Sequence, residues 1–407
     1  MRYPPGVDVL ERLRILGGTA ADDLDGPGSR PAARSRRGPA AAGIARVSLP
    51  GGRTVPVLRL LMTNVCELNC GYCAINRERN VRRASLRPEE VARLTAEFAR
   101  RGLIGGLFLS SGVAGGPAKT TERMLQAVEI LRERERFRGY VHLKLMPGVS
   151  EDYVARALEL ADRVSVNLEA ATEDALRTIA PMKDYRKLVG PMAAAHRLAA
   201  RREGALPAGQ VTQLVVGAAG ESDREILTTA GALYRQFRLR RVYYSAYHPV
   251  CGQVLAPPAP PIREHRLYQA DWLVRRYGFR PADLVLDERG NLPLRVDPKL
   301  AWALAHPERF PVEVNTADLR ALLLVPGIGP VSARRILSLR AEVRFRDLRD
   351  LARLGVVVKR ARHFLTLDGR YPGGPDIPHV EARQLALWPE GPGAACPLLG
   401  LAGGVRV

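Results

Sequence analysis

The sequence has 407 residues, which is enough for two or three domains and a large buried core. Lysine and arginine number 62 against 42 aspartate and glutamate residues, so the formal net charge of +20 favours polyanionic partners and argues against a small cationic substrate. Five cysteines in this length exclude a secreted disulfide scaffold, and no apolar run is long enough to span a bilayer. We therefore expect a cytoplasmic protein whose clustered thiols bind metal or do chemistry.

Residues 1–54 are predicted to form a basic, weakly ordered segment. Proline, glycine, alanine and arginine dominate residues 25–43, and the apolar residues there have no periodicity. The segment includes a basic cluster of Arg30, Arg34, Arg36 and Arg37. This cluster is either a solvated tail or an arm that lies along a phosphate backbone.

Six apolar runs rich in branched residues follow, and we predict each of them to be a strand. They begin at residues 55, 103, 140, 163, 210 and 241, and stretches with helical spacing separate them. Repeated strand–helix alternation predicts an α/β fold with a parallel sheet and crossover helices. A flat doubly wound sheet and a complete or partial barrel both fit this alternation.

Alternation within two of the runs favours a barrel over residues 55–255. Asn167 and Glu169 share one face of their strand and apolar residues share the other, and His142 and Lys144 alternate with leucine and valine in the same way. A strand covered by helices on both faces would be almost entirely apolar. The polar face therefore indicates a lumen that holds a polar ligand, unless these groups only lie near strand ends.

The remaining sequence divides into three parts. Residues 256–312 are predicted to be a proline-rich linker with connecting helices, residues 313–370 a small all-α domain, and residues 371–407 a flexible tail.

Three cysteines lie within eight residues, directly after the first predicted strand, in the pattern Cys66-Glu-Leu-Asn-Cys70-Gly-Tyr-Cys73. A structural zinc site usually takes four protein ligands, and no fourth cysteine is near in sequence. A [4Fe–4S] cluster normally takes four cysteines, so three would leave one iron open to an exogenous ligand. This pattern suits catalysis, with structural or regulatory metal binding as the alternative.

The CxxxCxxC spacing, with Tyr72 before the last cysteine, resembles the radical S-adenosylmethionine (SAM) superfamily. The superfamily carries this motif after the first strand of a partial (β/α)6 TIM-like barrel, which the six predicted strands match. The resemblance implies a [4Fe–4S] cluster held by Cys66, Cys70 and Cys73, SAM bound at the open iron, and an electron donor such as flavodoxin or ferredoxin. The cofactor would then supply a radical that abstracts a substrate hydrogen.

The same resemblance implies cofactor contacts where the barrel strands end. The segment from Phe108 to Gly112 takes the place of a Gly-Gly-Glu-like motif, although the usual glutamate is missing. The cofactor-binding candidates are Tyr72, Ser110, Ser111, Gly112, Asn167, Glu169, Gln213, Val216 and Gly217. Lys144 and Cys251 are the catalytic candidates, Cys251 as a hydrogen-atom donor unless it is simply a buried thiol.

A second motif, LLLVPGIGPVSARRIL, covers residues 322–337. Its glycines permit a tight turn, and the helix that follows presents free N–H groups suited to a phosphate. Ile328 is expected to pin the turn to the core. The segment resembles the helix–hairpin–helix family, which grips the DNA backbone without reading bases, and Leu354-Gly355-Val356 is expected to form a degenerate second turn.

Residues 315–370 contain twelve arginines or lysines against five acidic residues, which adds to the phosphate-binding expectation. A basic loop after the cysteines is expected to form either a rim that holds nucleic acid or a solvated face. The DNA-binding candidates are Pro326, Gly327, Ile328, Gly329, Ser332, Arg334, Arg335, Lys359 and Arg360 in the hairpin region, and Arg77, Arg82 and Arg83 at the rim.

From the cysteine loop to about residue 370, the chain resembles a family of radical SAM proteins described as DNA modification or repair proteins with a C-terminal helix–hairpin–helix. The resemblance implies action on a DNA base that is flipped out, damaged or single-stranded. Two alternatives are a tRNA-modifying radical SAM enzyme and a DNA-binding iron–sulfur redox sensor without radical chemistry. A DNA glycosylase fits less well, because its four cysteines follow the hairpin and its lysine position is occupied here by Pro330-Val331-Ser332.

Overall fold

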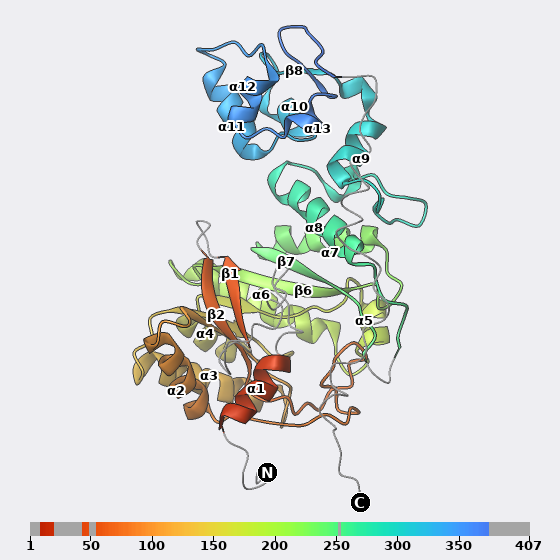
Figure 1. Ribbon diagram of the computed structural model, residues 1–407. Coiled ribbons are helices and arrows are strands. Elements are labelled where there is room, and N and C mark those ends of the chain that lie inside the picture. Colours follow the sequence, from red (N-terminus) through yellow and green to blue (C-terminus); the bar gives the residue numbers. More distant parts are fainter. Residues whose placement is uncertain (1–8, 20–42, 49–53, 251–253, 374–407) are drawn as a thin grey trace, which may run out of the picture. The chain divides into compact units, whose positions relative to one another are not determined.

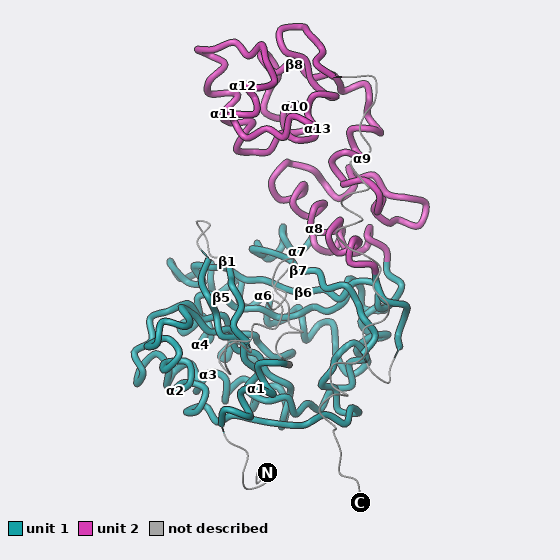
Figure 2. The backbone as a smooth tube through the Cα atoms, viewed as in Figure 1, with its two compact units in different colours: residues 1–221, 232–259, 393–407 teal, residues 222–231, 260–392 magenta. Residues whose placement is uncertain are grey.

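The computed structural model describes residues 9–19, 43–48, 54–250 and 254–373 (Figure 1). The arginine cluster between Arg30 and Arg37, the candidate Cys251, and the predicted tail beyond residue 373 lie outside the described residues. The chain divides into two compact units, shown in Figure 2. The first unit contains residues 1–221, 232–259 and 393–407, and the second contains residues 222–231 and 260–392.

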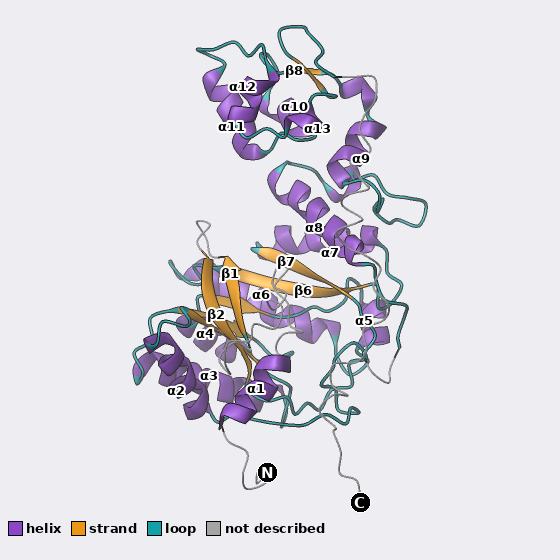
Figure 3. Ribbon diagram, viewed as in Figure 1, coloured by secondary structure: helices purple, strands orange, loops and turns teal. Residues whose placement is uncertain are grey.

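The first unit is built on a curled seven-stranded sheet, an open half-barrel whose strands follow one another in sequence order (Figure 3). Six strands pair in parallel, which confirms the predicted strand–helix alternation. Because these strands follow one another in sequence order and the sheet is curled, the fold is the partial barrel and not the flat doubly wound sheet. A seventh strand, β1, pairs antiparallel with β2. The strands are β1 (Ile44–Ser48), β2 (Thr54–Leu61), β3 (Gly106–Ser110), β4 (Tyr140–Lys144), β5 (Arg163–Ser165), β6 (Gly209–Val216) and β7 (Arg241–Ala246).

Crossover helices connect the parallel strands and pack against one another in sequence order, α2 on α3, α3 on α4, and α4 on α6. Local sequence explains where α2 begins: Pro88 suits the first helical position, and the Glu90 carboxylate accepts the Arg87 backbone N–H at 2.8 Å. The helices are α2 (Pro88–Arg100), α3 (Pro117–Glu133), α4 (Glu151–Leu160), α5 (Glu173–Ile179), α6 (Tyr185–Arg201) and α7 (Asp223–Phe237).

The prediction of a weakly ordered segment over residues 1–54 is wrong for two stretches. Helix α1 (Val9–Thr19) packs on β2, and β1 adds a strand to the sheet. Leu13 and Leu16 are buried, and Arg12 forms an ion pair with Glu90 at 2.8 Å. These contacts join residues more than seventy positions apart, so local composition could not reveal them.

The second unit has one hydrophobic core that joins segments predicted to be separate. Leu300 and Ala303 of α9 pack in the same cluster as Ile328 and Ile336, so the region predicted as a linker over 256–312 contributes to this core. The helical elements are α8 (Pro261–Arg276), η3 (Pro281–Asp283), α9 (Pro298–Ala305), η4 (Pro307–Arg309), α10 (Leu319–Leu324), α11 (Pro330–Leu339), α12 (Leu348–Arg353) and α13 (Val358–Ala361).

The prediction that residues 313–370 form an all-α domain is wrong, because this region takes part in a small sheet. Strands β8 (Val312–Glu313) and β9 (Leu365–Thr366) form a two-stranded parallel sheet that joins the two ends of the 313–370 region. Strands of two residues are too short to show a hydrophobic alternation, which is why the sequence pattern missed them. Among the described residues of both units, no helix is long and apolar enough to cross a membrane.

Two glycine turns in the second unit pack against each other. Gly327 connects α10 to α11 and Gly355 connects α12 to α13, with φ values of +93° and +87° that favour glycine. Val357 donates its N–H to the Gly327 carbonyl at 2.9 Å, and a Cβ on Gly327 would lie 2.6 Å from the Val357 carbonyl oxygen. Ile328 is 1% exposed and anchors its turn in the core, as predicted.

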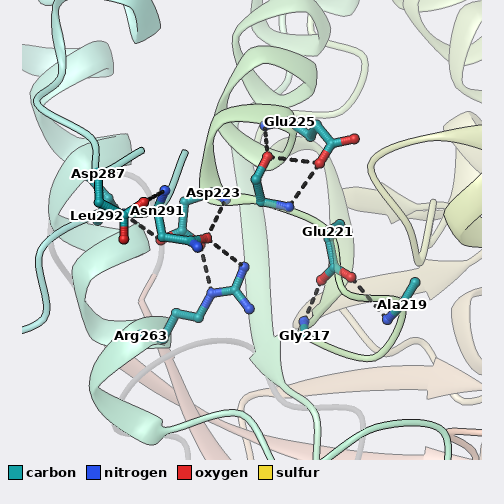
Figure 4. A network of polar contacts seen from close by, with 10 residues as sticks. Gly217, Ala219, Glu221, Asp223, Glu225, Arg263, Asp287, Asn291 and Leu292 are labelled. Carbon is teal, nitrogen blue, oxygen red and sulfur yellow. Dashed lines mark hydrogen bonds and ion pairs between the residues drawn. The ribbon is translucent and has the colours of Figure 1, made fainter. Parts of the chain in front are cut away.

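Buried carboxylates organise the segments around α7 (Figure 4). In the first unit, Glu221 accepts the backbone N–H groups of Gly217 and Ala219 and so closes the turn after β6. In the second unit, the buried Asp223 accepts Arg263 Nε at 2.8 Å and the Leu292 N–H at 2.9 Å. These bonds hold α8 and the turn before Leu292 to the first residues of α7.

Lys299 of α9 is buried beneath the first glycine turn. It is 7% exposed, its Nζ donates to the Ile328 carbonyl at 2.6 Å, and it lies 4.6 Å from the centroid of the Tyr277 ring. Burial, together with the nearby Arg360 guanidinium, lowers the pKa of Lys299 to about 7. Its charged form is therefore costly in the folded protein.

We predict that Lys299 makes stability rise with pH above 7. Its pKa is lower in the folded than in the unfolded state, so between pH 7 and about 10 the unfolded chain binds a proton that the folded chain does not. The Lys299→Met variant should lose this rise in stability. The control variant Lys359→Met, which replaces an exposed lysine, should retain it. Urea unfolding midpoints of the three proteins, measured from pH 6.5 to 9.5, test this, and parallel profiles for wild type and Lys299→Met would contradict it.

Candidate functional site: a thiol-lined cavity at the strand ends

A cavity of about 290 Å³ lies where the strands of the half-barrel end. Ser110, Lys144 and Ala246 line it from the last positions of β3, β4 and β7. Gln213 and Val215 line it from β6, because alternate residues of a strand point to the same face. The polar lumen inferred from the sequence is therefore present in this part of the barrel.

The three cysteines lie on the loop between β2 and α2, and all three thiols line this cavity. The loop is joined at its base, where Thr63 pairs with Ser85, and their hydroxyls are 2.5 Å apart. Between these points the backbone forms no helix and only short turns. A few backbone bonds, such as Glu67 N–H to the Val113 carbonyl at 2.9 Å, hold its path, and side chains supply many others.

Arg83 supplies several of these bonds at once. Its guanidinium donates to the backbone carbonyls of Asn64, Ile75, Asn76 and Arg79. Carbonyls on both sides of the cysteine motif are thus held by one planar group with five N–H donors. Arg83 thus holds this loop, and its role as a DNA-binding rim residue stays a prediction.

The cysteine loop is also fastened to the end of β3. The Glu67 carboxylate accepts the N–H groups of Gly115 and Gly116, at 2.5 and 3.2 Å. Gly112 donates its N–H to the Thr63 carbonyl at 2.7 Å, and a Cβ at that position would lie 2.4 Å from the Val65 carbonyl oxygen. Only glycine allows the two segments to approach this closely.

The donor set suits an iron–sulfur cluster better than a single ion. Among the described residues, no three histidine, cysteine, aspartate or glutamate side chains are arranged to hold one metal ion. The thiols nevertheless surround one cavity, and a cluster takes each thiolate on a different iron, so its ligands need not converge on one point. Burial raises the pKa of Cys73 to about 12 and also raises that of Cys70, so both thiols must lose protons when they bind iron.

An ion pair closes one side of the cavity. Lys183 Nζ lies 2.8 Å from a Glu169 carboxylate oxygen and 3.1 Å from the Tyr72 hydroxyl. Burial acts to lower the pKa of Lys183, but the Glu169 carboxylate together with the nearby Cys70 and Cys73 thiols outweighs it, and the pKa is raised. This contact links the cysteine motif to the end of the fourth parallel strand.

The backbone of Glu169 is strained, with a φ of +68°. Hydrogen bonds to β6 hold it in place: Glu169 donates to the Gln213 carbonyl at 2.9 Å and accepts the Val215 N–H at 2.7 Å. The sheet therefore fixes the direction in which this carboxylate leaves the backbone.

Most of the cofactor-binding candidates share this cavity, although their roles stay predictions. Val216 and Gly217 are not among its lining residues: Val216 is fully buried on the opposite face of β6 from Gln213 and Val215, and the Gly217 N–H is bound by Glu221. His142 also does not line it, and shares a hydrogen bond with the Ser165 hydroxyl at 2.9 Å. The candidates that line the cavity are Tyr72, Ser110, Ser111, Gly112, Lys144, Asn167, Glu169 and Gln213.

The DNA-binding candidates are only partly available to a partner. Pro326, Ile328 and Ser332 are buried, and Arg360 forms an ion pair with Asp297, so we withdraw these four side chains as direct phosphate contacts. Of the rim residues, Arg82 is exposed but paired with Glu11, and Arg77 is exposed. Arg334, Arg335 and Lys359 are exposed near the two glycine turns.

Sequence reasoning missed Lys183 and His248, which both line the cavity. The sequence did contain a signal for Lys183. Only six of the 62 basic residues are lysines, so each lysine marks a position where the otherwise preferred arginine is not used. Lys144, Lys183 and Lys299 each lie in the cavity or in a core, where an arginine would need more room and more hydrogen-bond acceptors.

We predict that Arg83 is required for cluster binding. Replacing Arg83 with Met should free four carbonyls around the cysteine motif and lower the iron and sulfide content after anaerobic reconstitution at least several-fold. The control is Arg77→Met, which removes an exposed arginine from the same loop and should load normally. Equal iron content in both variants would contradict the role assigned to Arg83.

Comparisons with known proteins agree with this geometry. Residues 60–233 match the Radical SAM superfamily. No curated protein matches the sequence.

Three solved structures illustrate the similarity to known proteins. The [FeFe]-hydrogenase maturase HydG from Carboxydothermus hydrogenoformans is 16% identical, with a TM-score of 0.43 over 53% of this chain and 50% of its own. The radical SAM methyltransferase TsrM from Kitasatospora setae is 13% identical, with a TM-score of 0.38 over 51% and 38%. Methylornithine synthase (PylB) is 16% identical, with a TM-score of 0.40 over 72% and 79%.

This chain thus spans half or less of the length of HydG and TsrM, and these distant likenesses carry no argument about its reaction. The superfamily match covers the half-barrel strands β3 to β6 and the whole cysteine loop. Enzymes of this superfamily use a [4Fe–4S] cluster and SAM. Residues 60–233 therefore form a radical SAM domain.

Proposed function

We propose that this radical SAM enzyme acts on DNA, modifying or repairing a base, and that its second unit holds the DNA backbone. The observation that carries the proposal is the pair of glycine turns, at Gly327 and Gly355, on the same chain as a radical SAM domain. Each turn joins two helices and is followed by a helix whose first N–H groups suit a phosphate oxygen.

Charge around the turns supports a polyanionic partner. Arg334 and Arg335 of α11 and Lys359 of α13 are exposed, and the chain as a whole has a formal net charge of +20. Such contacts position a nucleic acid without reading its sequence. The second unit therefore supplies affinity, and the choice of base falls to the cavity of the first unit.

Residues of the first unit have distinct roles in this proposal. Cys66, Cys70 and Cys73 hold the cluster, and the cavity-lining polar residues from Ser110 to Gln213 orient SAM. When bound, these cofactors supply a 5′-deoxyadenosyl radical. Lys144, at the end of β4, is the candidate to contact the substrate.

A base stacked inside a duplex cannot enter a barrel cavity. The substrate base is therefore flipped out, damaged or in a single strand, at an unstacking cost of about a few kcal/mol. The proposed electron donor is a small redox protein such as flavodoxin or ferredoxin.

Cleavage of SAM is the first test. We expect the reconstituted protein, with dithionite and SAM under anaerobic conditions, to form 5′-deoxyadenosine, and we expect single-stranded or damaged DNA to stimulate its formation. Cys66→Ala, Cys70→Ala and Cys73→Ala should each abolish the product. A fully loaded cluster that never cleaves SAM, combined with DNA affinity that depends on cluster oxidation state, would favour a redox sensor instead.

DNA binding is tested by its salt dependence. If about five phosphates are neutralised, log K should fall against log salt with a slope of about −4 to −5, and Arg334→Gln with Lys359→Gln should reduce the slope by about 2. Arg177→Gln removes an exposed arginine of α5 in the first unit and serves as the control. A slope near zero on duplex and single-stranded DNA would exclude the proposed partner, and tighter retention of tRNA would favour a tRNA-modifying enzyme.

A further inference from the structure

One aromatic side chain of the second unit is exposed in a way that its core does not explain. Trp272 of α8 has 45% of its surface accessible, whereas its neighbours Asp271 and Leu273 are buried. An exposed indole on a soluble protein is a costly feature, because its large apolar surface remains in contact with water. Tryptophan, with its large apolar ring and one polar N–H, is enriched at binding surfaces.

Two arginines flank this indole. Arg275 and Arg276 follow Trp272 by three and four residues, so all three side chains lie on one face of α8. The guanidinium carbons of both arginines lie 5.4 Å from the centroid of the Trp272 ring. At this distance both guanidinium groups lie over the ring within cation–π range, and 45% of the Trp272 surface stays accessible beside them.

An ion pair fixes the position of one of these groups. Arg275 Nε forms an ion pair with the buried Asp271 at 2.7 Å, one helical turn away. One guanidinium is therefore held in place, which reduces the entropy lost on binding. The Trp272 side chain neighbours the hydroxyl of Tyr277, whose pKa is raised by burial and lowered less strongly by the indole.

The same tyrosine connects the exposed indole to the first glycine turn. Tyr277 packs against the hydrophobic core that contains Ile328, and its ring lies under Lys299, which donates to the Ile328 carbonyl. A Cβ on Gly329 would lie 3.5 Å from the Tyr277 hydroxyl. Trp272 and the glycine turn are thus joined through one side chain, within a single unit.

We propose that Trp272, Arg275 and Arg276 form a platform on which an unpaired nucleotide stacks, beside the backbone held by the glycine turn. An aromatic face contacts any base, and adjacent guanidinium groups attract the phosphates that flank it. The inference rests on the proposed action on DNA and extends it, because it predicts a preference for single-stranded or gapped DNA. That preference suits an enzyme whose substrate base must leave the stack.

The chemistry of the three side chains favours a nucleotide over a phosphate alone or a protein segment. A phosphate would not need the indole, and an apolar protein partner would not need two guanidinium groups over the ring. A stacked base with its phosphate uses both features together.

The test compares variants of the full-length protein in their affinity for labelled oligo-dT of about 20 nucleotides and for a duplex of the same length. Trp272→Ala and Trp272→Leu should weaken oligo-dT binding about 10-fold or more and change duplex binding by less than about 2-fold. Trp272→Phe keeps an aromatic plane and should retain affinity within about 3-fold. Leu304→Ala, which removes a 46% exposed apolar side chain from α9 of the same unit, should bind as wild type.

The outcomes separate this inference from the proposed function. Duplex and oligo-dT binding that falls in the Arg334→Gln, Lys359→Gln variant but is unchanged in Trp272→Ala would overturn the platform alone. Loss of affinity in Trp272→Ala that Trp272→Phe does not rescue would also overturn it, since an aromatic plane would not be the cause. No binding to any nucleic acid would overturn both. Urea unfolding midpoints within error of wild type establish that each variant is folded.

Discussion

The candidate active site depends on how one irregular loop keeps its shape. Three thiols must stay around a cavity while the backbone that carries them has no helix or strand of its own. Arg83 meets this need by donating to four carbonyls on both sides of the motif, and Glu67 and Gly112 join the loop to the end of β3. The side-chain bonds satisfy carbonyl and N–H groups that regular secondary structure would otherwise pair. Together these contacts position the cysteines around the cavity.

The sheet contributes the rest of the site through a simple alternation. On β6, Gln213 and Val215 face the cavity, and Leu214 and Val216 pack into the core behind it. Glu169 lies just beyond a neighbouring strand, where bonds to β6 hold its backbone in an unfavourable conformation. Its carboxylate consequently forms an ion pair with Lys183, and Lys183 in turn donates a hydrogen bond to the Tyr72 hydroxyl of the cysteine motif. The strained backbone conformation of Glu169 thus places its carboxylate where it can pair with Lys183.

In the second unit, some basic side chains are buried or paired within the protein and others are exposed to solvent. Arg360 forms an ion pair with Asp297, and Lys299 is buried under a glycine turn. The number of basic residues in the sequence therefore overstates the positive charge that is accessible to a partner. Arg334, Arg335 and Lys359 are exposed and lie near the paired turns. Tyr277, which follows Trp272 at the end of α8, lies beside the first of these turns. The proposed nucleic-acid surface therefore combines backbone contacts with one aromatic contact.

The sequence by itself determined the strand–helix alternation, the three-cysteine motif and both glycine turns, because each is encoded by residues close together in the chain. Spacing of three cysteines, alternation within a strand and glycine in a turn are local patterns that survive without tertiary information. The tertiary structure alone decided that residues 9–19 and 44–48 belong to the first unit, that Lys183 joins Glu169, and that Arg83 holds the cysteine loop. Those outcomes depend on contacts between residues distant in sequence, or on which of many arginines finds buried carbonyls, and composition cannot distinguish one arginine from another.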